Sequence, residues 1–170
     1  MENKETYILF IWIVLFSLLF VVFFVPIHIP FSGEKDTQIV KFLATGNSKY
    51  VQDLQTNEIS HMNDVRNLIM LGLTIFLSLT PYLIAKKKYN SKSLFKNLVW
   101  FDVICVLCLI LFNTFFTLFH KLLFPQGNWQ FSYDSVLIQT YPQSFFIWML
   151  FFIVLIVNLL VLILKRKKIN

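Results

Sequence analysis

The chain has 170 residues, of which 57% are hydrophobic, 18% aromatic and only 14% charged. Soluble domains average about 45–50% apolar and about 25% charged residues, so this composition, with a mean hydropathy of +0.68, excludes a soluble globule. The net charge of +6 comes from short basic blocks beside apolar runs. This arrangement favours anionic lipid over nucleic acid as the partner of the basic residues.

Four apolar stretches are long enough to cross about 30 Å of hydrocarbon at about 1.5 Å per residue. They cover residues 7–27, 68–85, 98–119 and 145–164. We therefore predict an all-α membrane protein with four transmembrane helices in a single integral membrane domain over residues 1–170. The first stretch is longer than the apolar core of a signal peptide, and no small-residue cleavage site follows it, so we expect it to remain in the mature protein.

Basic residues gather on one side of the predicted membrane. Ten of the fifteen lie at the start of the chain, between the second and third spans or after the fourth. The positive-inside rule makes that side, and with it both termini, cytoplasmic. The other side holds two outer segments, at about 28–67 and 120–144, with six of the nine acidic residues and all three histidines. A catalytic or binding site is therefore expected on the outer side of the membrane.

The first outer segment is too short to bury a core of its own, so we expect it to pack on the helix bundle. Ile39, Phe42 and Leu43 recur at helical spacing, and Gly46 follows them as a stop signal. Residues 57–67 contain no helix breaker, which predicts one helix that projects above the membrane and continues through the second span. The sequence Pro-Gln-Gly-Asn at 125–128 predicts a turn.

Two groups of polar residues are candidates for a functional site. His61 precedes Asp64 by three residues on the predicted helix, so the carboxylate can orient the imidazole. Asn113, Thr117 and His120 form a polar stripe at the outer end of the third span, and polar residues in a span usually face the bundle interior or a wet cavity. The simpler alternatives are an exposed histidine beside an acid, and ordinary interhelical hydrogen bonds.

Other chemistries fit the sequence less well. Three histidines without Cys or Glu at ligand spacing disfavour a zinc site, and no cofactor is expected. Cys105 and Cys108 have CxxC spacing, but they lie about 13 Å into the third span counted from Lys96, so we interpret them as small apolar fillers. Ser60 adjoins His61, but helix neighbours at i,i+1 point in different directions, which disfavours a serine nucleophile.

Two separated motifs carry a resemblance to a known family. The first is His-Met-Asn-Asp-Val-Arg at 61–66, just before the second span. The second begins at His120 and runs through Phe-Pro-x-Gly-x-Trp at 124–129 and Asp134 to Tyr-Pro-x-x-Phe-Phe at 141–146. These motifs and the four-span topology resemble the lipoprotein intramolecular transacylases (Lit), which are small membrane enzymes of Gram-positive bacteria.

The resemblance implies an acyltransferase of the bacterial cell membrane. Such an enzyme moves one fatty acyl chain from the diacylglyceryl group of a lipoprotein to the α-amine of its N-terminal cysteine, giving a lyso-form lipoprotein. The expected partners are therefore a diacylated lipoprotein and membrane lipid. The two important histidines of the family map onto His61 and His120. We add six supporting residues: Asp64, Arg66, Asn113, Thr117, Asp134 and Tyr141.

Histidine suits this reaction. The reactants are already tethered, which can contribute roughly 7–11 kcal/mol, so the enzyme has mainly to take a proton from the amine and return one to the glycerol oxygen. The sequence leaves open which histidine is the base.

A second hypothesis is a membrane scaffold or accessory subunit that binds a partner through its outer segment and catalyses nothing. A scaffold gives no reason for His61 and His120 to approach each other. A shared catalytic site requires their rings to lie within about 10–12 Å, and we expect Tyr141 or Asp134 at the rim of their pocket.

Overall fold

The computed structural model describes residues 4–31, 33–86 and 88–167, and within these ranges it contains helices and no strands. Four helices are long and apolar enough to cross a membrane: α1 (Lys4–Phe23), α3 (Thr56–Lys86), α4 (Ser91–Ile110) and α7 (Gln143–Lys167). The shorter elements are η1 (Val25–His28), α2 (Glu34–Thr45), η2 (Ser48–Tyr50), α5 (Phe112–Leu123) and α6 (Val136–Thr140). The predicted all-α fold with four spans is confirmed.

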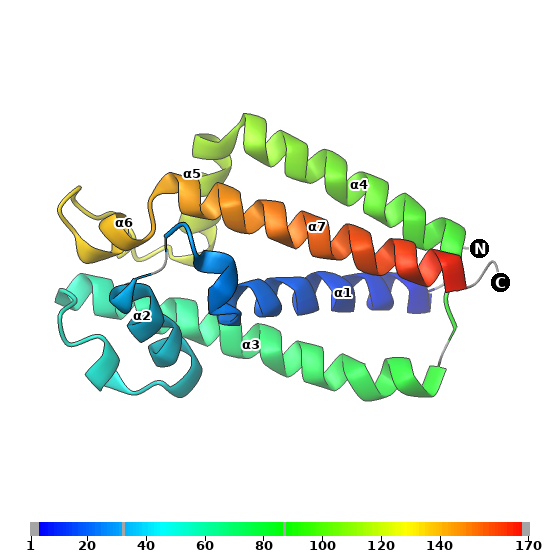
Figure 1. Ribbon diagram of the computed structural model, residues 1–170, viewed down its shortest axis with the longest axis horizontal. Helices are drawn as coiled ribbons and strands as arrows, with labels where there is room; N and C mark the ends of the chain where they lie inside the picture. The colour runs from blue at the N-terminus through cyan, green and yellow to red at the C-terminus, as the bar shows by residue number, and fades with distance from the viewer. Residues whose placement is uncertain (1–3, 32, 87, 168–170) are drawn as a thin grey trace.

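Helix α1 lies at the centre of the bundle. It packs against α3 on one side and against α7 and α4 on the other (Figure 1). In the part of the bundle nearest the two termini, Ile13 of α1 is buried among apolar residues of α4 and α7 such as Leu94 and Val157. The start of α1, the end of α7 and the connection from α3 to α4 share one end of the bundle (Figure 1).

The short elements α2, η2 and α6 form a cap at the other end of the bundle (Figure 1). The cap has no separate core, because Ile39 and Phe42 of α2 are buried in one cluster with Leu19 of α1 and Met62 of α3. Helix α2 ends where the sequence predicts, since Gly46 adopts the left-handed conformation (φ 71°) and donates its N–H to the Phe42 carbonyl at 2.7 Å.

A buried carboxylate joins the two outer segments. Glu58, in the first turn of α3, is fully buried, and its Oε2 accepts a hydrogen bond from the Gln55 N–H at 2.8 Å. Its Oε1 accepts from the Leu137 N–H at 2.9 Å, at the start of α6. One side chain therefore caps α3 and fixes α6 against it.

The third predicted span differs from the structure. The sequence predicts one helix over 98–119, but the helix ends at Ile110, and Leu111 adopts φ −106° and ψ 34° before α5 begins. Helix α5 then leaves the direction of α4 and runs across the bundle (Figure 1). The polar stripe predicted on this span therefore lies on α5, a separate helix with its own orientation.

Candidate active site

His61 lies in the second turn of α3, in the part of the helix that precedes the apolar stretch from residue 68. Its side chain is 8% exposed. Two aromatic rings meet it edge-on, with the centroid of Phe124 at 4.6 Å and that of Phe131 at 5.5 Å. The Nδ1 atom is buried and has no hydrogen-bond partner among the described residues. A ring protonated at both nitrogens would carry a charge in this apolar setting, so the ring is held in its neutral form.

His120 lies in the last turn of α5 and is also 8% exposed. Its Nδ1–H donates to the carbonyl of Phe116, one turn earlier, at 2.7 Å. The rings of Phe116 and Trp129 lie at 4.0 and 5.0 Å from it. Burial lowers the pKa of His120, and the hydrogen bond to Phe116 offsets part of this effect.

The two imidazoles lie side by side. Their centroids are 5.9 Å apart and their planes are inclined by 29°. This separation is well inside the limit of about 10–12 Å set above for a shared substrate group. Because the bend at Leu111 redirects α5 toward α3, residues 59 positions apart in the chain meet in one aromatic-lined site.

Asp64 has a different partner from the one predicted. Its Oδ2 accepts two hydrogen bonds, from Gln126 Nε2 at 2.6 Å and from Asn128 Nδ2 at 2.7 Å. Asn128 Nδ2 also donates to Ser60 Oγ at 3.1 Å. The carboxylate thus holds the turn between α5 and α6. Sequence reasoning missed Gln126 and Asn128 as site residues, although they sit inside the predicted turn.

The other predicted supporting residues lie in varied surroundings. On α5, Thr117 is half-buried and Asn113 is exposed. The guanidinium of Arg66 lies directly over Gly46, where a Cβ would come within 2.9 Å of Arg66 Cζ. Asp134 is fully exposed, and a hydrogen bond from the Ser132 side chain holds its pKa below the ordinary carboxyl value. These residues lie outside the ring contacts of the two histidines.

Tyr141 belongs to a second buried cluster that the sequence did not reveal. Its O–H donates to Asp36 Oδ1 at 3.0 Å, and burial followed by the nearby carboxylate raises its pKa. The same carboxylate accepts from His28 Nδ1 at 3.0 Å, and His28 Nε2 donates to the Val21 carbonyl at 2.9 Å. This His28 cluster joins α1, η1, α2 and the residues before α7.

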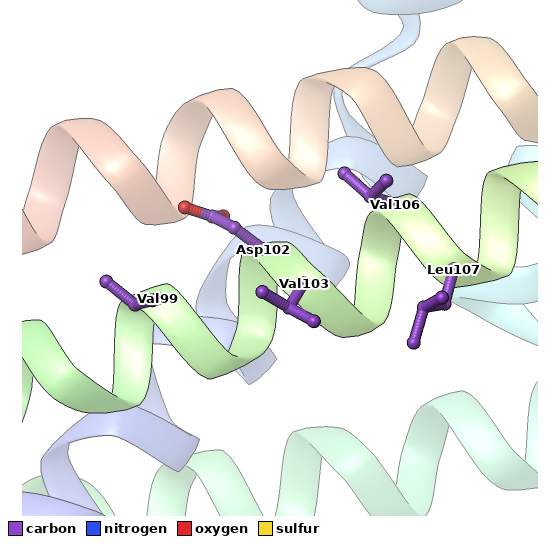
Figure 2. Close-up of a pocket in the computed structure, with 5 residues that line it drawn as sticks. All are labelled: Val99, Asp102, Val103, Val106 and Leu107. Carbon is purple, nitrogen blue, oxygen red and sulfur yellow. The ribbon is translucent and has the colours of Figure 1, made fainter.

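A surface pocket lies apart from both clusters, on α4. It is lined by Val99, Asp102, Val103, Val106 and Leu107 (Figure 2). Asp102 Oδ1 accepts a hydrogen bond from Asn158 Nδ2 of α7 at 2.9 Å, so its carboxyl group joins two membrane-spanning helices. Among the described residues, no group of three His, Cys, Asp or Glu side chains is placed to hold a metal ion.

Comparisons with known proteins indicate the family of this chain. The family model "Lipoprotein intramolecular transacylase Lit" matches residues 35–146, about two thirds of the chain, and this range contains both histidines. The chain is also similar to the solved structure of the membrane integral lipoprotein intramolecular transacylase Lit from Bacillus cereus, with a TM-score of 0.65 and 21% identity over 98% of this chain and 95% of that one. No curated protein matches the chain.

The two matches carry different weight. At 21% identity the solved structure supports the fold, including a membrane-integral helix bundle, and nothing finer. The family model supports the activity, because it covers most of the cap and of the site-bearing helices. The chain therefore belongs to the lipoprotein intramolecular transacylase (Lit) family and is a multi-pass membrane acyltransferase.

Proposed function

We propose that His61 and His120 are the catalytic pair of this transacylase. The observation that supports this assignment is the contact between two buried, neutral imidazoles from different helices, 5.9 Å apart. A scaffold protein would have no use for this arrangement, since burying two polar rings among aromatic side chains costs free energy. Catalysis offers a reason for it, because a base has to be unprotonated and close to the reacting atoms.

The proposed substrate is a diacylated lipoprotein, and the reaction moves one of its acyl chains within the molecule. The nitrogen of the α-amine attacks the carbonyl carbon of a glyceryl ester, a C–N bond forms, and the C–O bond to glycerol breaks. The amine has a pKa of about 8 and enters mainly as an ammonium. It therefore loses two protons on becoming an amide, one of which is returned to the glycerol oxygen while the other leaves to water.

Two neutral imidazoles suit the unprotonated amine, which attacks with two N–H groups. In His120 the proton is on Nδ1, because the carbonyl of Phe116 can only accept, so Nε2 carries the lone pair. We assign His120 as the base that takes the proton of the attacking nitrogen and passes it to the leaving oxygen. We assign His61, whose Nδ1 is unpartnered among the described residues, to bind the second N–H of the amine.

The surroundings of the pair fit a lipid substrate. Phe119 and Leu122, on the same helix as His120, are 54% and 79% exposed, so α5 presents an apolar face next to the site. We propose that this face meets membrane lipid at the outer surface of the bacterial cell membrane, with both chain termini in the cytoplasm as the basic residues indicate. The ester bonds of a membrane-anchored lipoprotein lie at that depth.

The test is reconstitution of the full chain in lipid vesicles with a synthetic diacylated lipopeptide. Mass spectrometry of the N-terminal peptide should detect a species of unchanged mass whose α-amine is acylated and whose glyceryl group carries one acyl chain. Fragmentation distinguishes this product from the substrate. If the α-amine stays free with the folded protein present in the vesicles, the proposed reaction is wrong.

A further inference from the structure

Asp64 uses only one of its two carboxylate oxygens in hydrogen bonds with the described residues. Gln126 Nε2 and Asn128 Nδ2 both donate to Oδ2, at 2.6 and 2.7 Å. The side chain is half-buried, but Oδ1 is not among the described polar atoms that are both buried and unpartnered, so Oδ1 reaches the protein surface. The two amides therefore hold the carboxylate in place and leave Oδ1 available to a ligand.

Within the described ranges, no basic side chain forms an ion pair with this carboxylate. Both ion pairs found there are formed by other residues. Arg66 is the next basic residue along α3, but side chains at i and i+2 of a helix point in different directions, and its guanidinium lies over Gly46. The neighbouring imidazoles of His61 and His120 are neutral. The negative charge of Asp64 is therefore not balanced by a counterion from this part of the chain.

Attachment of the turn between α5 and α6 does not by itself explain a charge at this position. The carbonyl oxygen of an asparagine has two lone pairs and would accept both amide hydrogens equally well. A half-buried carboxylate costs more free energy of desolvation than such an amide does. The charge therefore indicates a second use of Asp64, in which Oδ1 meets a cation from outside the chain.

Asp64 lies beside the proposed catalytic pair. It follows His61 by three residues on α3, so the two side chains lie on one face of the helix with their Cβ atoms about 5–6 Å apart. The Cα–Cβ bonds of a helix tilt toward its N-terminus, which brings the Asp64 side chain toward the level of His61. The substrate of the proposed reaction carries its positive charge on the reacting nitrogen, because the α-amine enters as an ammonium. This cation and the available oxygen thus come together within one helical turn of the imidazoles.

We propose that Asp64 Oδ1 binds the α-ammonium group of the lipoprotein's N-terminal cysteine. This inference rests on the proposed function, from which it takes the substrate. The nitrogen loses one proton to water before it attacks, and it becomes positively charged again as the C–N bond forms, until His120 takes its second proton. The carboxylate therefore attracts the nitrogen in the bound substrate and in the transition state alike. The amide of the product carries no charge and loses this contact, which favours release of the product.

The first test measures binding of lipopeptides that cannot react. Two diether lipopeptides, in which ether links replace the glyceryl esters, differ only in that one has the free α-amine and the other lacks it. Each carries a dye at the C-terminal end of its peptide, and the full chain in detergent micelles is titrated with it near pH 7. We expect wild type to bind the amine form about tenfold more tightly, as for a charge-assisted hydrogen bond that is partly open to water. Equal affinities would overturn the proposal, and this comparison needs no mutation.

Asp64→Asn is the matching change in the protein. The asparagine keeps an acceptor oxygen for Gln126 and Asn128 but places an NH₂ group where Oδ1 was. This variant should bind both lipopeptides equally, with the affinity of wild type for the form without the amine. Glu34→Gln is the control, because Glu34 is exposed on α2 and its replacement removes the same charge from another part of the cap. It should keep the wild-type preference. A preference that survives Asp64→Asn would place the ammonium on aromatic rings of the site and refute the proposal.

The kinetics of the reactive diester lipopeptide distinguish substrate binding from a role in proton transfer. Because the contact is present in both the bound substrate and the transition state, Asp64→Asn should raise KM by about tenfold and leave kcat within a few-fold of wild type. A loss of kcat at unchanged KM would mean that Asp64 acts on the reaction itself, and the proposal would be wrong. If wild type forms no lyso-form product, the proposed reaction fails, yet the diether lipopeptides still decide whether Asp64 binds the ammonium.

Discussion

At the scale of single residues, the carbonyl of Phe116 decides which nitrogen of His120 meets a substrate. It accepts the Nδ1–H, so the lone pair is on Nε2, and burial keeps the ring neutral near pH 7. Proton transfer by a placed histidine contributes about 10²–10⁴ in rate. We therefore expect His120→Ala and His61→Ala each to lower the initial rate of lyso-form lipopeptide production by about that factor, measured at equal amounts of folded protein.

Asn63→Ala is the control for this pair of variants. Asn63 lies on α3 two residues after His61, but it is exposed and its amide bonds only the Ile59 carbonyl at 3.0 Å among the contacts described. Its rate should equal that of wild type. Full activity in both histidine variants would mean that His61 and His120 take no part in the mechanism. The fold and the family assignment would still stand.

The proximity of His61 and His120 could be predicted from the sequence, whereas the hydrogen-bond partners of the residues around them could not. Each histidine stands in a motif at the outer end of a predicted helix, so topology alone brings both to one side of the membrane. The hydrogen-bond partner of Asp64 could not be predicted from the sequence. Helical spacing relates residues within one helix, whereas Asn128 lies in a turn 64 residues later in the chain. The hydrogen bond from Tyr141 to Asp36 was equally hard to predict, because the two residues lie 105 positions apart in the chain.

At the scale of elements, the His28 cluster holds the cap on the bundle. Both ring nitrogens of His28 face acceptors, the Asp36 carboxylate and the Val21 carbonyl, so the ring is satisfied only when it is protonated at both positions. Burial alone would lower the pKa of His28, but the hydrogen bonds to Asp36 and Val21 and the charge of Asp36 raise it above the ordinary value. The cap is thus attached partly by a buried ion pair.

This pair makes the stability of the protein depend on pH in a defined direction. A histidine whose pKa is raised on folding contributes stability that is fully present below its unfolded pKa of about 6.5 and is lost as pH rises through the folded value. We expect the difference in Tm between wild type and His28→Gln to shrink as the pH is raised from about 6 to about 9. A difference that stays constant, measured by thermal unfolding in detergent, would show that His28 is neutral in the fold.

The end of α2 gives a prediction about backbone conformation. Gly46 has φ 71°, which costs an L-residue roughly 1–2 kcal/mol, and a Cβ there would meet Arg66 Cζ at 2.9 Å. Gly46→Ala should therefore lower the free energy of unfolding by at least that amount. Gly127→Ala shares the positive φ (78°) but has open space, so it should lose less. Gly33→Ala, with neither feature, should lose only the preference for Gly over Ala at the N-cap of α2 in the same denaturation experiment.

The break between α4 and α5 is the feature of the fold that the sequence pattern does not predict. Leu111 sits in an apolar run without Gly or Pro, so hydropathy predicts one continuous span there. The bend comes from tertiary contacts, since His120 and Phe116 pack against Trp129 and Phe146 from later parts of the chain. The local hydropathy pattern contains no information about such long-range contacts. The spans themselves were predictable because each needs only a long apolar stretch.

At the scale of the whole molecule, the transfer should proceed directly from ester to amine. Cys105 and Cys108 lie on the membrane-spanning α4, and Ser60 Oγ already accepts a hydrogen bond from Asn128. None of these side chains is placed to use either imidazole as its base. The α-amine is therefore the expected nucleophile, with no covalent acyl-enzyme and no ping-pong kinetics.

A mixing experiment tests this route. Diacyl lipopeptide labelled with heavy isotopes in both its acyl chains and its peptide is combined with unlabelled lipopeptide in vesicles that contain the protein. Because the chain never leaves its own molecule in a direct transfer, each product should carry its N-acyl chain and its peptide with the same label. Mixed labels, or an acylated form of the protein found by mass spectrometry, would mean that a side chain carries the acyl group between two steps. Ser60, beside His61, and the exposed Ser132 would then be the first residues to replace by alanine.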